Sequence, residues 1–183
     1  MEVQMILETK DLKIRPTEMD DLELFYVWER DPAVTEFFSI GDGQTRDELY
    51  QKYFNDLQDS AARQFTVELK GECENTIIGR IVIGDIIDGW KAEIWRIYIA
   101  DTALRGCGYG RQAMEAVMKY CFEELKLQRL YLDHYTGNPA RYLYLNLGFK
   151  PEGCLRNNCR KNGVLYDVHL LSMLREEYEA LYK

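Results

Sequence analysis

Arg105-Gly106-Cys107-Gly108-Tyr109-Gly110-Arg111 is the stretch on which the interpretation of this chain depends. Glycine adopts positive φ at little steric cost, so three glycines in five residues let successive backbone N–H groups turn toward one point. A helix is predicted to follow over about 108–125, because apolar residues recur there at spacings of three and four: Met114, Val117, Met118, Cys121, Phe122 and Leu125. The first N–H groups of a helix lack partners within it, and its dipole is positive at that end. With Arg105 and Arg111 beside it, the loop is predicted to hold the diphosphate of a bound cofactor.

Composition narrows the range of functions. The chain has 183 residues, which suits one domain over residues 1–183, and a net charge of −8, which disfavours nucleic-acid binding. No apolar run has the length of a membrane span, and Met1–Gln4 does not resemble the start of a signal peptide. The five cysteines are odd in number and form no CxxC pair, so reduced thiols and a cytoplasmic location are expected. With only two histidines, His134 and His169, no metal is expected.

Apolar periodicity and capping residues predict the secondary structure. A helix is expected after Thr17, to be ended by Asp31-Pro32, and Thr45 with Glu48 forms a capping box for a second helix. Asn138-Pro139 is expected to begin a short helix that runs to about Asn146, with Gly148 as the stop after it. Arg175–Tyr182 is expected to form a terminal helix. Strands are predicted at 5–15, 64–70, 76–83, 92–100, 129–134, 149–153 and 164–173. The fold class is therefore α/β in the broad sense (α+β), with a mixed sheet and helices on its faces.

The glycine loop taken alone leaves two other interpretations open. Residues 108–113 also fit the dinucleotide pattern G-x-G-x-x-A, and Asp133 lies where a ribose-binding acid would be expected. This ranks second, because residues 101–104 separate the preceding strand from the glycines and three antiparallel-looking strands come first. The other interpretation is a glycine turn that only tightens a strand–helix junction.

The wider pattern resembles a known family. Arg-x-x-Gly-x-Gly after a strand, then a helix, a strand, Asn138-Pro139 and Tyr144-x-x-x-Gly148-Phe149, is similar to the GNAT superfamily of acetyl-CoA-dependent N-acetyltransferases. The Leu12-x-Ile14-Arg15-Pro16 start and the Glu152-Gly153 to Asp167-Val168 ending resemble its RimJ/RimL and spermidine-acetyltransferase branch. The resemblance implies a mostly antiparallel, splayed sheet of six to seven strands with helices on both faces. It also implies an acyltransferase that moves acetyl from acetyl-CoA, without a metal, to a primary amine by direct attack in a ternary complex.

The resemblance assigns roles to particular residues. The coenzyme would be bound by the loop and by the strand before it, through Arg105, Gly106, Cys107, Gly108, Tyr109, Gly110, Arg111 and the backbone of Ile97, Tyr98 and Ile99. Tyr144 would give a proton to the departing thiolate, and Glu93 is the candidate base or water-chain relay, with Asp133 and His134 as fallbacks. The distance along the chain from Glu93 to Arg105 is longer than usual in the family, so a bulge or extended loop is expected. Asn138 would contact coenzyme, although it lies one position closer to Tyr144 than the family's asparagine, and is otherwise a helix cap.

The acceptor stays open at this stage. The branch includes enzymes that act on protein N-termini, polyamines and other small amines, and a homodimer is common in the family. No nucleic-acid or membrane partner is expected for this chain. Residues Phe37–Gly43 and the turn Asn157–Gly163 are expected to border the acceptor site. Two alternatives to the enzyme are a non-catalytic acetyl-CoA-binding module and, ranked lower, a dinucleotide-dependent oxidoreductase.

Overall fold

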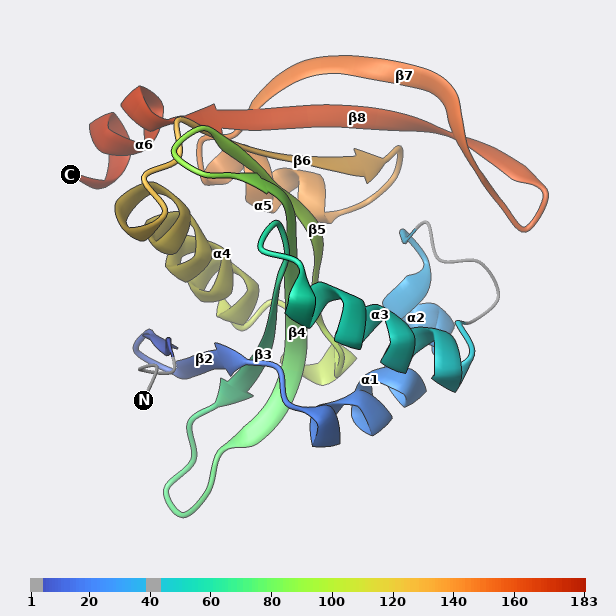
Figure 1. Ribbon diagram of the computed structural model, residues 1–183. Coiled ribbons are helices and arrows are strands. Elements are labelled where there is room, and N and C mark those ends of the chain that lie inside the picture. Colours follow the sequence, from blue (N-terminus) through green and yellow to red (C-terminus); the bar gives the residue numbers. More distant parts are fainter. Residues whose placement is uncertain (1–4, 39–43) are drawn as a thin grey trace.

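The computed structural model describes residues 5–38 and 44–183, and places eight strands in one sheet with helices on both faces (Figure 1). The expectations that concern Met1–Gln4 and residues 39–43 lie outside the described part. The strands are β1 Leu7–Glu8, β2 Leu12–Pro16, β3 Arg63–Leu69, β4 Thr76–Ile87, β5 Lys91–Ile99, β6 Arg129–Tyr135, β7 Lys150–Lys161 and β8 Val164–Leu174. The helices are α1 Leu22–Trp28, α2 Pro32–Thr35, α3 Arg46–Gln58, α4 Tyr109–Lys119, α5 Ala140–Asn146 and α6 Arg175–Tyr182.

The sheet order is β1-β2-β3-β4-β5-β6-β8-β7, one strand more than expected because the two-residue β1 is added at the edge. Every neighbouring pair is antiparallel except β5 and β6. That parallel pair is joined through α4 and is in register only at Lys91↔Arg129, Ala92↔Leu130 and Glu93↔Tyr131. Beyond these residues the two strands separate, so the sheet is splayed as expected. A mostly antiparallel sheet also excludes the doubly wound fold that the dinucleotide interpretation requires.

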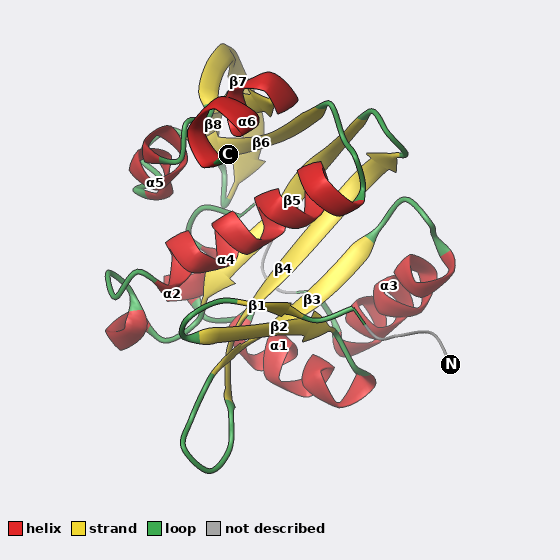
Figure 2. Ribbon diagram, turned by 90° about the vertical axis from the view of Figure 1, so that its left-hand side faces the viewer, coloured by secondary structure: helices red, strands yellow, loops and turns green. Residues whose placement is uncertain are grey.

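Apolar side chains bury both faces of the sheet. On one face α4 contributes four fully buried residues, Ala113, Met114, Val117 and Met118, to the main core. On the other face Leu22 and Phe25 of α1 pack with Leu49 and Tyr53 of α3. Figure 2 shows α4 crossing the strands on one side and α1 and α3 behind them. The loop before α4 is therefore held at the end of a helix that is fixed by burial.

A β-bulge in β5 accounts for the long spacing between Glu93 and Arg105. Ile83 pairs with Ile94 but Val82 pairs with Arg96, so Trp95 is the extra residue. The Trp95 ring lies across β4 at Gly84, where an added Cβ would come within 2.1 Å of the ring. Glycine at position 84 is thus what lets the Trp95 ring lie there.

Several predicted boundaries were wrong. β4 continues to Ile87 and β7 to Lys161, so the turn expected at Asn157–Gly163 shrinks to Asn162-Gly163. Asp31 does not simply end α1; its carboxylate accepts from the amide of Ala33 and so caps α2. The turn before α1 is capped by Glu18 with Asp21 rather than by Thr17. The capping box of Thr45 and Glu48 and the terminal helix are confirmed.

Candidate active site

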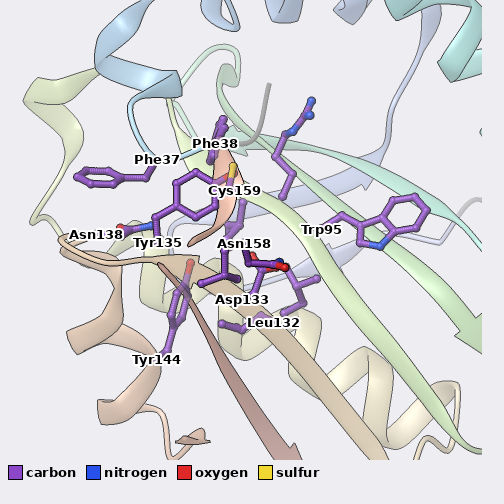
Figure 3. Close-up of a pocket in the computed structure, with 14 residues that line it drawn as sticks. Phe37, Phe38, Trp95, Leu132, Asp133, Tyr135, Asn138, Tyr144, Asn158 and Cys159 are labelled. Atoms are coloured by element: carbon purple, nitrogen blue, oxygen red, sulfur yellow. The ribbon is translucent and has the colours of Figure 1, made fainter. Parts of the chain in front are cut away.

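The gap between β5 and β6 contains two cavities that share part of their lining. The first, here called the loop cavity, has a volume of about 400 Å³ and reaches Arg105, Gly106 and Gly110. The second, the hairpin cavity, has a volume of about 220 Å³ and reaches Asn158 and Cys159 of the β7–β8 hairpin (Figure 3). The residues common to both linings are Phe37, Phe38, Ile97, Asn138 and Tyr144. A long molecule that enters along the glycine loop can therefore reach the hairpin cavity at Tyr144.

The glycine loop has the backbone conformation that an anion cradle requires. Gly106 and Gly108 have φ of 80° and 87°, which side chains rarely adopt, although a Cβ at either would meet no atom within 4 Å. In the described part of the chain, the backbone amides of residues 106–111 donate to no protein acceptor, and Gln112 is the first to bond back, to the Gly108 carbonyl. These N–H groups at the start of α4 remain available to an anionic ligand.

The two arginines beside the loop also bond within the protein. Arg105 donates through Nε to the Ile99 carbonyl at 3.2 Å and through Nη2 to the Ala33 carbonyl at 2.8 Å. Arg111 pairs with Glu115 at 3.2 Å on the surface of α4. Arg105 therefore ties the loop to the end of β5 and to α2, in addition to the positive charge that it was expected to supply.

The backbone of β5 presents alternate residues to the gap. The Ala100 amide donates to the Ile78 carbonyl, so the backbone N–H and C=O of Tyr98, two residues earlier, also point toward β4. The backbone N–H and C=O of Ile97 and Ile99 therefore point the other way, into the gap between β5 and β6. Arg105 already occupies the Ile99 carbonyl. Of the three residues expected to bind the pantetheine arm through their backbone, Ile97 is thus the best placed. Tyr98 instead donates its side-chain hydroxyl to Glu29, at 3.2 Å.

Tyr144 lies on α5 with its ring buried and its hydroxyl at the junction of the two cavities. The side chain is 6% exposed and packs against Phe149 and His134, at ring-centroid distances of 6.4 and 6.3 Å. Among the described residues no hydrogen-bond partner of the hydroxyl is found. Burial, with a smaller contribution from the charge of Asp133, raises its pKa to about 12. The group is protonated at neutral pH and free to donate.

Two carboxylates lie at the base of the gap. Asp133 of β6 lines the hairpin cavity and is exposed there. The protein atoms around its carboxylate still displace part of its hydration, and this desolvation raises its pKa. Glu93 of β5 pairs in register with Tyr131, two residues before Asp133, and lines neither cavity. Burial and then the charges of Asp133 and Asp85 raise the pKa of Glu93. The fallback base Asp133 is thus better placed to meet a substrate than Glu93.

The other fallback base, His134, does not line either cavity. Its Nδ1 lies 2.9 Å from the Tyr135 carbonyl, and its ring stacks on His169 with centroids 5.1 Å apart. Burial lowers its pKa, so the imidazole is neutral and belongs to the packing behind Tyr144. Asn138 accepts from the Ala140 amide at 2.9 Å, although Pro139, and not Asn138 as expected, is the N-cap of α5. Asn138 also lines both cavities.

Among the residues of the hairpin cavity that were not anticipated from the sequence, Arg96 is the one that carries a charge. Arg96 follows the bulge at Trp95, lines the hairpin cavity, and donates to Glu29 at 2.8 Å. Its guanidinium also lies over the Phe38 ring, 5.7 Å from the centroid. The only signal in the sequence was an arginine between the apolar and aromatic pairs Ile94-Trp95 and Ile97-Tyr98. The predicted acceptor segments do contribute to this cavity, through Phe37, Phe38, Asn158 and Cys159.

Comparison with known proteins yields one consistent result. The model of the acetyltransferase (GNAT) domain matches residues 11–150. Spermidine N(1)-acetyltransferase of Vibrio cholerae is 27% identical over 168 residues, which cover 91% of this chain and 95% of that protein. The uncharacterized N-acetyltransferase p20 of Bacillus licheniformis is 30% identical over 94% of this chain and 97% of its own length. The crystal structure of spermidine N-acetyltransferase from Vibrio cholerae, in complex with CoA and spermine, superposes with a TM-score of 0.84 at 27% identity, over 93% and 99% of the two chains.

Proposed function

Because this chain belongs to the acetyltransferase (GNAT) domain family, and is therefore an acetyl-CoA-dependent N-acetyltransferase, we propose that a primary amine attacks the thioester directly, with Tyr144 as proton donor. The observation that carries this proposal is the Tyr144 hydroxyl, which lies at the junction of the loop cavity and the hairpin cavity and has no hydrogen-bond partner within residues 5–38 and 44–183. The loop cavity would hold the coenzyme, with its diphosphate at residues 105–111. The hairpin cavity would hold the acceptor.

The chemistry needs a base, and the acids at the base of the gap can supply one. An alkyl ammonium has a pKa of about 10, so the acceptor must lose a proton before it attacks. Asp133 is open to the hairpin cavity and would take that proton. Glu93, whose pKa is raised by burial and by the charge of Asp133, would be the next proton acceptor behind it. As the carbon–sulfur bond breaks, the phenol of Tyr144 gives its proton to the coenzyme thiolate and recovers one from solvent.

Two further points concern the acceptor and the location of the enzyme. The names of the Vibrio cholerae enzyme and of its complex with spermine make spermidine and spermine the reference polyamines against which other primary amines are compared. All five cysteines are free, which supports a reducing, cytoplasmic location. No helix of the described residues is long and apolar enough to cross a membrane.

Thermal shift followed by an amine panel tests the proposal. Acetyl-CoA at a hundred times its dissociation constant should stabilise the protein by about 2.7 kcal/mol, and NAD should not. Thiol release should then depend on a primary amine and scale with its concentration. Binding of acetyl-CoA without thiol release for any amine in the panel would contradict direct attack at this site.

A further inference from the structure

A buried cluster of charges borders the hairpin cavity. Glu29, which follows α1, accepts through Oε1 from Arg80 at 2.6 Å, from Arg96 at 2.8 Å and from the Tyr98 hydroxyl at 3.2 Å. The side chains of Glu29 and Arg80 are 3% and 1% exposed. Burial raises the pKa of Tyr98 well above its ordinary value, so the phenol is neutral. Two guanidinium groups share one carboxylate, and the cluster carries one positive charge in excess.

Arg96 is the member of the cluster that can offer this charge to a ligand. Arg80 is enclosed, and its second Nη donates to Gln64. Arg96 keeps 16% of its side-chain surface accessible and lines the hairpin cavity, and among the described residues its hydrogen-bond partner is Glu29 alone. Its other N–H groups are therefore unused donors in a partly desolvated space, where a hydrogen-bond acceptor is strongly favoured.

The opposite wall of the same cavity carries the opposite charge. Asp133 of β6 lines the same cavity as Arg96 of β5. Tyr144 lies at the junction of this cavity with the loop cavity, and Figure 3 shows Asp133 and Tyr144 in the lining. Such a site suits a molecule with a cation at one point and an oxygen acceptor at another. An acceptor that is cationic along its whole length meets a fixed cation at the Arg96 wall.

We propose that Arg96 selects the acceptor: it binds a carboxylate or carbonyl oxygen of a molecule whose primary amine is held at Asp133, and Glu29 positions Arg96 for this contact. This inference rests on the proposed function, since it concerns the acceptor of the same reaction. Arg96 contacts substrate, while Glu29 is a positioning residue that acts through Arg96.

A set of primary amines with the same five-carbon chain isolates the contribution of the group at the far end of the acceptor. Pentylamine, 1,5-diaminopentane, 5-aminopentanamide and 5-aminopentanoate differ only in the group at the end distant from the reacting amine. In the wild-type enzyme kcat/KM is expected to be about 10- to 100-fold higher for 5-aminopentanoate than for the diamine, the range for a hydrogen bond to a charged group. The amide is expected to fall between them.

Four variants connect that preference to Arg96. Arg96→Gln should abolish the preference by raising KM for 5-aminopentanoate, with the KM for acetyl-CoA unchanged, and Arg96→Lys should keep part of it because the charge remains. Glu29→Gln should raise the same KM less than Arg96→Gln does. The matched control is Arg156→Gln, on the exposed strand β7, which should behave as wild type. An unchanged thermal shift with acetyl-CoA establishes that each variant is folded.

The two proposals fail in different ways. If wild-type enzyme prefers the diamine or spermidine to 5-aminopentanoate, or if Arg96→Gln keeps the wild-type preference, the role of Arg96 is wrong while amine acetylation stands. If no amine is acetylated although acetyl-CoA binds, the proposed function itself fails.

Discussion

Replacing Tyr144 by phenylalanine tests the proton-donor role with little disturbance to the fold. The hydroxyl has no hydrogen-bond partner among the described residues, and the ring contacts with Phe149 and His134 are kept. The free energy of unfolding is therefore expected to change by less than about 0.5 kcal/mol. With a pKa of about 12, roughly one hydroxyl in ten thousand is ionised at pH 8, so the wild-type group is a competent acid across the working range.

The expected effect is on turnover. A positioned general acid contributes about 10²- to 10⁴-fold, which corresponds to about 3–5 kcal/mol of activation free energy. Tyr144→Phe should lose this factor in kcat, measured by continuous thiol release at saturating acetyl-CoA and amine. The affinity for acetyl-CoA, measured by calorimetry, should stay within about twofold.

The matched control is Tyr142→Phe, on the same helix but with a side chain 67% exposed. It should retain wild-type kcat, and both variants should unfold at the wild-type temperature. A Tyr144→Phe enzyme that keeps more than a third of wild-type kcat would refute the proton-donor role, because another group would then protonate the thiolate.

Three further predictions concern the base, the loop and the far end of the sheet. Asp133→Asn should lower kcat/KM about 10²- to 10⁴-fold near neutral pH, and the loss should shrink as the pH approaches the pKa of the acceptor amine, in a pH–rate profile. Gly108→Ala should cost about 1–2 kcal/mol in chemical denaturation, because φ is 87° there, and weaken acetyl-CoA binding, while Gly153→Ala, with open space and no positive φ, should do neither. Arg129 lowers the pKa of Glu152 to about 2, so the ionised carboxylate stabilises the folded state fully at pH values above its unfolded pKa of about 4.3. The melting temperature of wild type should therefore exceed that of Glu152→Gln at pH 7, and the difference should decline as the pH falls toward 2.

Capping residues and apolar periodicity predicted most helices and strands, but they did not predict which apolar side chains are buried. The capping box at Thr45 located α3, because capping depends only on residues a few positions apart. Phe54 and Leu57 extend the apolar stripe of the same helix, yet they are 44% and 63% exposed. α3 packs against α1 and against β3 of the sheet, so only part of its apolar stripe is covered. Helical periodicity shows that a helix has an apolar face. How much of that face is buried depends on the helices and strands that pack against it.

Site residues divide in the same way. The glycine loop and Tyr144 were identified from the sequence because their chemistry depends on local backbone conformation and on a motif of fixed spacing. Arg96 and Asp133 are far apart along the chain, and the pairing of β5 with β6 and the separation of the two strands beyond it bring them to one cavity, while Glu29 reaches Arg96 from the end of α1. The sequence alone therefore determined the glycine loop, the strand–helix order and the family. The tertiary structure decided which charges line the hairpin cavity, because burial and long-range pairing, unlike turns and caps, depend on residues distant in the chain.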